Sequence, residues 1–385
     1  MSSKSYPQLE NSKIKMQKSK LQVKSRDWKK MKLGKAFDLK YGFGLPERSR
    51  KAGNIPVYGS SGVVGVHDEA TVNSQGIIIG RKGNVGSVYY SSSPFYPIDT
   101  VYYIDSLKIQ GNLKFFYYFL QRIPFQKIGS DVGVPGLNRD MAYNLDIIIP
   151  ENINEQKQIA AILSAFDDKI ELNNKINKNL EQMAQAIFKE WFVNFRFPGY
   201  KKSEFIDSEL GKIPKEWEVK QLRDIVSIEY GKGPSTKDLK KAGYSVYGAN
   251  GIIGYCEKYD FNESQIIIGC RGVVGSLFRT LPKSSITHNS LIIKLTILSE
   301  KNYLFMLLKN SNLQSVAGGS AQPQITIKEL SQLPILFAKQ EIREKFEKIV
   351  ENLEKKRLNI VYENQKLSSL RDLLLSKLMS GGIKV

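Results

Sequence analysis

Two long stretches of the chain carry apolar residues at alternating steps of four and three. The first runs from about Glu155 to Trp191 and the second from Glu341 to about Met379, and neither contains Pro or Gly. This repeat predicts two long helices that pack along each other through one seam. The apolar seam positions are Ile159, Leu163, Phe166, Ile170, Leu180 and Ile187 in the first stretch, and Ile342, Phe346, Ile349, Leu353, Ile360, Leu367 and Leu370 in the second.

Four seam positions are polar instead, namely Asn173, Asn177, Lys356 and Glu363. Polar residues at such positions can fix the register of two helices at some cost in stability. They can equally mark the point where the seam loosens, and the sequence leaves both interpretations open.

Before each helical stretch lies a segment rich in Gly, Tyr and β-branched residues. Short apolar runs such as Ile77–Ile79 and Val101–Ile104 are bounded by turn residues, which is typical of strands. Residues 113–123 change to a helical period that Pro124 interrupts. The pattern predicts a compact α+β domain, followed by a long helix capped near Asn154.

The chain then repeats itself at an offset of 189 residues. Trp28 corresponds to Trp217, and the run 77–80 (Ile-Ile-Ile-Gly) corresponds to 266–269, with the same sequence. The repeat predicts two tandem α/β domains with pseudo-two-fold symmetry, separated by a long antiparallel two-helix coiled coil. A helix of about 38 residues is roughly 57 Å long and could set the distance between the domains. The expected organisation is a basic N-terminal arm (1–25), a first domain (26–153), a long helix (154–197), a connector (198–215), a second domain (216–338) and a C-terminal long helix (339–385).

Charge narrows the choice of partner. The 385 residues include 57 Lys and Arg against 38 Asp and Glu, a formal net charge of +19. Such a chain attracts polyanions, so nucleic acid is the first candidate and a membrane surface the second. No apolar run of roughly eighteen residues could span a bilayer. The N-terminus does not have the pattern of a secretory signal, and two cysteines are too few for a disulfide framework or a four-ligand zinc site, so we expect a cytoplasmic protein that binds no metal.

Repeated glycines accompany the strands of both copies. Gly59, Gly62 and Gly65 could form a loop that holds phosphate, but strand-like sequence lies on both sides of them. A dinucleotide-binding loop needs a helix after it. We therefore expect these glycines to form tight turns and bulges.

Basic and aromatic residues cluster in equivalent loops of the two copies. A merely solvated basic surface would explain the charge, but the repeated placement favours a groove for a phosphate backbone, with amides able to pair with base edges. The candidate DNA-binding residues are Lys40, Tyr41, Arg48, Ser60, Ser61, Arg81, Lys82, Asn84, Asn138 and Arg139 in the first copy, and Tyr230, Lys232, Lys237, Asn250, Arg271, Gln322, Gln324 and Thr326 in the second.

Catalytic patterns are scarce. The chain has no P-loop and no Gly-x-Ser-x-Gly elbow, and its two histidines, His67 and His288, do not occupy equivalent repeat positions. A lone histidine is more often structural than catalytic. The sequence therefore predicts no catalytic residue.

The order of domains and helices resembles the specificity subunit of type I restriction–modification systems. The resemblance rests on the openings Trp28–Leu33 and Trp217–Leu222, the run 55–65 (Ile-Pro-Val-Tyr-Gly-Ser-Ser-Gly-Val-Val-Gly), the junction 155–163 and the linker 207–217, and it covers nearly the whole chain from Trp28 onward. It implies that each domain is a target-recognition domain reading one half of a split, asymmetric DNA sequence. It also implies that the helices set the gap and dock two modification subunits.

In this family the partners carry the chemistry. The resemblance implies that the modification subunits bind S-adenosylmethionine and methylate adenine, and that two motor/endonuclease subunits use ATP and Mg. The chain itself has no Asn-Pro-Pro-Tyr/Phe methyltransferase motif. A non-catalytic, sequence-specific DNA-binding subunit is thus the first hypothesis. The alternatives are a basic scaffold that binds nucleic acid without sequence preference, and an enzyme site hidden in the Gly-rich repeat.

Overall fold

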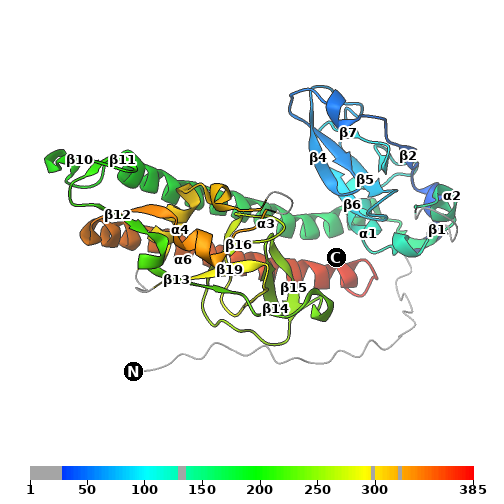
Figure 1. Ribbon diagram of the computed structural model, residues 1–385. Coiled ribbons are helices and arrows are strands. Elements are labelled where there is room, and N and C mark those ends of the chain that lie inside the picture. The colour runs from blue at the N-terminus through cyan, green and yellow to red at the C-terminus, as the bar shows by residue number, and fades with distance from the viewer. Residues whose placement is uncertain (1–27, 129–135, 296–299, 320–322) are drawn as a thin grey trace. The chain divides into compact units, whose positions relative to one another are not determined.

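The computed structural model describes residues 28–128, 136–295, 300–319 and 323–385. The expected N-terminal arm, Gln322 and most of the Gly129–Leu137 loop lie outside these residues. The chain forms two compact units: unit 1 combines residues up to Leu172 with Asn364–Val385, and unit 2 spans Asn173–Glu363. Each unit contains one α+β domain and a part of both long helices (Figure 1).

Unit 1 is built from three small sheets. Their strand orders are β1-β9, β2-β8-β5-β6 and β4-β3-β7. The elements are β1 (Trp28–Lys32), β2 (Lys40–Tyr41), β3 (Ile55–Gly59), β4 (Gly62–His67), β5 (Gly76–Gly80), β6 (Val88–Ser91), β7 (Tyr96–Pro97), β8 (Val101–Ile104), α1 (Leu113–Leu120), α2 (Arg139–Tyr143) and β9 (Asp146–Pro150).

Unit 2 repeats this topology strand for strand. Its orders are β12-β20, β13-β19-β16-β17 and β15-β14-β18. The elements are β12 (Glu218–Gln221), β13 (Val226–Tyr230), β14 (Tyr244–Gly248), β15 (Gly251–Cys256), β16 (Ile266–Gly269), β17 (Leu277–Arg279), β18 (Ser285–Ile286), β19 (Ser290–Leu295), α4 (Lys301–Asn310), α5 (Ile327–Ser331) and β20 (Pro334–Phe337). The predicted duplication is therefore a duplication of fold, and the α+β class is confirmed.

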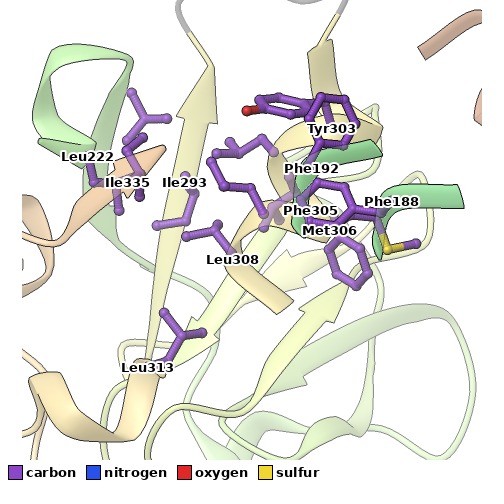
Figure 2. Packing of buried hydrophobic residues seen from close by; sticks show 14 of the residues in the cluster. Phe188, Phe192, Leu222, Ile293, Tyr303, Phe305, Met306, Leu308, Leu313 and Ile335 are labelled. Carbon is purple, nitrogen blue, oxygen red and sulfur yellow. The ribbon is translucent and has the colours of Figure 1, made fainter. Parts of the chain in front are cut away.

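The central strands β5 and β8 are buried along their whole length. Side chains alternate between the two faces of a strand. Ile77 and Ile79 therefore join the cluster that contains α1, while Ile78 packs on the other face with Phe95 and Tyr103. In unit 2 the cluster behind β16 and β19 gathers Ile293, Tyr303 and the last turns of the first long helix (Figure 2).

The repeated glycines have the structural role expected for them. Gly62 and Gly251 open β4 and β15 with φ angles of 97° and 88°, a conformation that L side chains rarely adopt. The β3–β4 hairpin shifts register between Val57 and Tyr58, and the β14–β15 hairpin shifts at the equivalent pair. These loops are turns and bulges between strands, not the start of a phosphate-binding helix.

The two long helices are α3 (Ile153–Phe188) and α6 (Gln340–Leu378). The side chain of Asn152 accepts from the amide of Asn154 (2.8 Å), so the start of α3 is held two residues before the expected cap. A π-helical segment, Lys189–Val193, extends the helix α3. The expected connector contains an unpredicted hairpin of β10 (Phe205–Ser208) and β11 (Gly211–Pro214).

In unit 1 the first half of α3 packs against the last turns of α6. Ile159 and Leu163 are fully buried in one cluster with Leu378. Further along α3, Nη1 of Arg371 donates to Oδ1 of Asp167 (2.6 Å). Residue numbers rise on one helix as they fall on the other, so the two segments are antiparallel.

In unit 2 the second half of α3 packs against the first half of α6. The rings of Phe188 and Phe346 lie 5.7 Å apart. Asn173 donates through Nδ2 to Oε2 of Glu363 (2.9 Å), so two of the polar seam residues pair with each other. The segments are again antiparallel, as the sequence predicts.

The predicted seam of α6 is wrong at two apolar positions. Ile349 is 41% exposed and Leu370 is 49% exposed, whereas the neighbours Val350 and Arg371 face inward. The buried stripe keeps a seven-residue repeat, because Arg343, Val350 and Leu378 are buried and Arg357 and Arg371 are half-buried. The predicted line from Ile342 through Ile349 to Leu370 therefore lies one residue before the inward-facing line, whereas the line through Phe346, Leu353, Ile360 and Leu367 is placed as predicted. The remaining predicted positions Phe166, Ile170, Leu180, Ile187, Leu353, Ile360 and Leu367 are half-buried, and Ile342 is buried.

Candidate nucleic-acid interface

Three predicted residues of unit 1 meet although they are far apart in sequence. Tyr41 ends β2, Arg81 follows β5, and Arg139 begins α2. The guanidinium carbons of Arg81 and Arg139 lie 5.3 and 5.0 Å from the centre of the Tyr41 ring. The Tyr41 side chain is 48% exposed, so this cluster is open to solvent. We call these three residues the arginine–tyrosine cluster.

Backbone bonds hold the arginine–tyrosine cluster in place. Arg81 donates from Nε and Nη2 to the carbonyl oxygen of Asp99 (3.3 and 2.7 Å). Its own carbonyl accepts the amide of Leu137 (2.9 Å), which ties the segment before α2 to the loop after β5. These bonds orient the guanidinium of Arg81 and hold the start of α2 beside it.

Tyr102 of β8 forms the floor of the site, and sequence reasoning missed it. Its hydroxyl donates to the carbonyl oxygen of Leu137 (3.1 Å), and Arg81 lies 5.9 Å from its ring centre. Burial is the main reason that the pKa of Tyr102 lies above its usual value, and the hydrogen bond with Tyr41 adds to it. The residues border an open hollow of about 380 Å³ that Lys82 and Asn138 also line. Only the pairing of β2 with β8 could have revealed Tyr102, because that pairing sets Tyr41 opposite Tyr102.

The charge of this cluster depends on whether a carboxylate pairs with its two arginines. In the described part of the chain, neither Arg81 nor Arg139 forms an ion pair with a carboxylate, and the Nε of Arg139 is buried without a hydrogen-bond partner. By contrast, Arg343 and Arg371 bind the carboxylates of Glu300 and Asp167. Three basic side chains, Arg81, Lys82 and Arg139, line the hollow together with one carboxylate, Asp140, so its net charge is positive. A positive hollow with several donors suits a ligand that offers acceptors.

A second group of predicted residues lies at the turn between β3 and β4. Asn84 donates from Nδ2 to Oγ of Ser61 (3.1 Å). Ser87 donates to the carbonyl oxygen of Ser60 (2.6 Å), which joins the loop after β5 to this turn. Ser60, Ser61 and Asn84 are thus brought together, and Lys82 in the same loop is exposed.

Two basic candidates of unit 1 lie apart from the cluster. Lys40 forms an ion pair with Asp105 (2.7 Å), and this hydrogen bond raises the pKa of the Lys40 ammonium. Lys40 and Tyr41 are neighbours on a strand, so their side chains point to opposite faces. Arg48 lies on an exposed 3₁₀ turn, Glu47–Ser49.

Two other candidates cap helices. Oδ1 of Asn138 accepts the amide of Met141 (3.0 Å) at the start of α2, and Oγ1 of Thr326 accepts the amide of Glu329 (3.2 Å) at the start of α5. The side chain of Glu329 in turn accepts the amide of Thr326, which completes a capping box. The pattern Thr-x-x-Glu at 326–329 is the sequence signal that identifies this role.

Unit 2 places different chemistry at the position of the arginine–tyrosine cluster. Tyr230 corresponds to Tyr41, but Cys270, Leu291 and Ile327 stand where Arg81, Tyr102 and Arg139 stand in unit 1. Cys270 and Leu291 are fully buried. The Cys270 thiol donates weakly to the carbonyl oxygen of His288 (3.7 Å), the counterpart of Asp99, and burial raises its pKa.

The remaining candidates of unit 2 lie wholly or partly at the surface. The side chain of Tyr230 is half-buried, and the others are exposed. They are Lys232, Lys237, Asn250, Arg271 and Gln324.

The histidines do not assemble a catalytic group in the described residues. His67 is 7% exposed, and its Nδ1 accepts the amide of Lys51 (3.1 Å), so it serves the fold. His288 is exposed and stands at the position of Asp99. Within the described ranges no group of His, Cys, Asp and Glu could hold a metal ion, and no helix is long and apolar enough to cross a membrane.

The sequence model of one protein family matches this chain twice. The family is described as "Type I restriction modification DNA specificity domain", and the matches cover residues 25–182 and 214–365. Each match contains one α+β domain and much of the long helix that follows it.

Relatives and solved structures point the same way. The MjaIX specificity subunit of Methanocaldococcus jannaschii is 31% identical in an alignment of 257 residues, and the match covers 60% of this chain and 59% of that protein. The HindI specificity subunit of Haemophilus influenzae is 27% identical over 335 residues, covering 65% of this chain and 71% of that protein. Both are named as specificity subunits of type I restriction enzymes. The crystal structure of the S subunit from M. genitalium matches 91% of this chain and 96% of its own at a TM-score of 0.55 and 20% identity, a likeness of fold.

Proposed function

Because this chain belongs to the family of type I restriction modification DNA specificity domains, we propose that it is the DNA-recognition subunit of a type I restriction–modification system. Each unit reads one half of a split DNA target. The chain supplies no catalytic residue. Methylation, cleavage and the binding of S-adenosylmethionine, ATP and Mg belong to two modification and two motor subunits, in the cytoplasm.

One observation carries the proposal: the same scaffold occurs twice with different side chains at equivalent positions. The strand orders of the two units agree throughout. A scaffold that bound nucleic acid by charge alone would need no such difference. The guanidinium pair of unit 1 and the apolar set of unit 2 therefore favour two recognition surfaces that prefer different bases.

The helices have a second role in this proposal. Each unit holds an antiparallel pair of α3 and α6 segments, and the apolar side chains Leu172, Met183 and Leu373 remain about half exposed on them. In this proposal the helices dock the modification subunits and set the spacing between the half-sites. Exposed apolar residues on a helix are suited to a protein partner.

The proposal is tested by selection from random duplexes. The full-length chain, assembled with its modification subunits, is incubated with a duplex library at about 150 mM salt, and the retained DNA is sequenced. We expect two short, unlike half-sites at a fixed gap. A single contiguous or palindromic site would contradict the proposal.

The two alternative functions, a non-specific scaffold and a hidden enzyme, predict different results for the same protein samples. A non-specific scaffold shows a steep loss of affinity with salt and no enriched sequence. A hidden enzyme in the Gly-rich repeat requires turnover by the purified chain alone. The turn geometry of Gly62 and Gly251 removes the phosphate-loop argument for that enzyme.

A further inference from the structure

The arginine–tyrosine cluster keeps two like charges together without a partner. Both guanidinium groups lie within 5.3 Å of one ring centre, and the carbonyl oxygen of Asp99 is the acceptor bound by Arg81. Two positive groups on one ring repel each other and are costly to hold unless a ligand offsets the charge. Arg343 and Arg371 have carboxylate partners, but no carboxylate among the described residues pairs with either guanidinium of the cluster, so no side-chain anion offsets their charge.

Comparison of the two copies separates two kinds of basic residue. Lys82 of unit 1 corresponds to Arg271 of unit 2, and both are exposed. Arg81 and Arg139 have no basic counterpart, because Cys270 and Ile327 take their places. The DNA backbone is the same at every half-site, so a phosphate contact can be common to both units, whereas a contact that reads a base must differ when the half-sites differ.

We propose that Arg81 and Arg139 read the major-groove edge of a guanine in the half-site bound by unit 1, and that Lys82 and Arg271 contact phosphate. This inference rests on the proposed function. Guanine presents two acceptors in the major groove, N7 and O6, and an arginine has only donors. Adenine presents an acceptor beside a donor, which would oppose a guanidinium.

The surroundings of the two arginines support base reading over a loose charge contact. The bonds from Nε and Nη2 to Asp99 fix the plane of Arg81, and Tyr41 lies against both guanidinium groups. The hollow of about 380 Å³ admits the edge of a base. A guanidinium that is already oriented loses less freedom when it forms a bidentate contact.

The test compares four single variants of the full-length chain in its complex. Arg81→Gln and Arg139→Gln remove a guanidinium of the cluster; Lys82→Gln and Arg271→Gln remove the exposed charges. Each complex is titrated with duplexes that carry each of the four bases at every position of both half-sites. For at least one of the two cluster variants, we expect discrimination at one guanine to fall by roughly 5- to 150-fold. The base preferences of the unit 2 half-site and of the other positions in the unit 1 half-site must stay unchanged, and the latter reports that unit 1 of the variant is folded.

The two controls respond differently. We expect Lys82→Gln and Arg271→Gln to weaken binding to every duplex by the same factor and to reduce the slope of log affinity against log salt by about 0.9. If Arg81→Gln and Arg139→Gln behave like these controls, the cluster binds phosphate and the inference is overturned.

A second probe uses the unaltered protein, so it does not depend on the folding of a variant. Replacing the identified guanine by 7-deazaguanine removes the N7 acceptor and keeps the base pair. The wild-type complex should lose affinity for this duplex, and the responsible arginine variant should bind it as well as it binds the normal one. The wild-type complex could bind two clear half-sites while no guanine in them loses discrimination in Arg81→Gln or Arg139→Gln. That result refutes this inference and leaves the proposed function standing. A complex with no sequence preference refutes the proposed function itself.

Discussion

A buried ion pair in unit 2 offers a sharp test of the energetics of the fold. Arg343 is 4% exposed and Glu300 is 5% exposed. Arg343 donates from Nε and Nη2 to one oxygen of Glu300 (2.9 and 2.6 Å) and from Nη1 to the carbonyl oxygen of Ala338 (2.7 Å). Its guanidinium carbon lies 3.7 Å from the ring centre of Phe337.

The substitution Arg343→Met leaves the carboxylate of Glu300 buried without its cation. Breaking such a pair on one side costs about 3–5 kcal/mol, because the remaining charge has lost both water and partner. Replacing both residues by apolar ones, as in Glu300→Leu with Arg343→Met, removes the desolvation cost of both charges. We expect the double variant to be as stable as the wild type or more stable by about 1–4 kcal/mol.

Unit 1 contains a matched control. Gln156, 1% exposed, occupies the corresponding turn of α3. It donates to the carbonyl oxygen of Pro150 (2.8 Å) and accepts the amide of Asn112 (2.9 Å). No charge is involved, so Gln156→Met should cost only the loss of neutral hydrogen bonds, about 1–3 kcal/mol.

Amide hydrogen exchange of the full-length chain, read by mass spectrometry, measures the two units separately. The opening free energy of β16 and β19 reports unit 2, and that of β5 and β8 reports unit 1. Arg343→Met should lower the first by about 3–5 kcal/mol and leave the second unchanged. The reasoning is refuted if Arg343→Met costs no more than Gln156→Met, or if the double variant fails to recover stability.

Three further predictions concern pH, turn geometry and spacing. Burial raises the pKa of Glu347 above 4.5. The stability that its protonated carboxyl contributes is therefore complete below that pH and is lost as the pH rises through the folded pKa. In urea titrations, the free energy of unfolding of Glu347→Gln should rise relative to that of the wild type as the pH increases from about 4 to 7. Glu354→Gln should show the opposite trend, because burial of Glu354 is outweighed by the hydrogen bond and charge of Arg357 and its pKa lies below 4.5. At Gly62, with φ at 97°, Ala should cost about 1–2 kcal/mol, whereas Gly44→Ala, with open space around the new methyl group, should change the melting temperature little. One heptad added to both α3 and α6 lengthens each helix by about 10 Å and should widen the gap between half-sites by about three base pairs; changed half-sites at an unchanged gap would exclude the spacer role.

Most of the fold could be predicted from local patterns in the sequence. Strands and turns could be predicted because the 189-residue repeat shows the same Gly and apolar positions twice, and each copy supports the other. The seam of α6 was only partly predictable, because Ile349 and Val350 are adjacent apolar residues and either one fits a seven-residue repeat. The prediction chose the line through Ile349 and Leu370, and the inward-facing line runs one residue later, through Val350 and Arg371.

The candidate site was less predictable, since its parts come together only through sheet pairing. Arg81 and Arg139 stood among many basic residues, and the sequence could not separate them from Lys40, which Asp105 neutralises. Asn138 and Thr326, chosen as candidates for base contacts, also cap helices through their side-chain oxygens, and the sequence alone did not identify the capping role. A side chain's role depends on which backbone groups lie within hydrogen-bonding reach, and that information is three-dimensional.

Duplication explains how one chain can hold a fixed fold beside variable chemistry. The elements common to both units are those with strict backbone demands, such as the φ angles of Gly62 and Gly251 and the register shift after Val57 and Val246. The position of Arg81 has no such demand, because its side chain needs only the carbonyl oxygen of residue 99. A cysteine meets the equivalent carbonyl in unit 2 through a weaker bond. Under the proposal that Arg81 reads a base, substitution there would change the base preference without a new demand on the backbone, which is the property that a surface for reading unlike DNA half-sites requires.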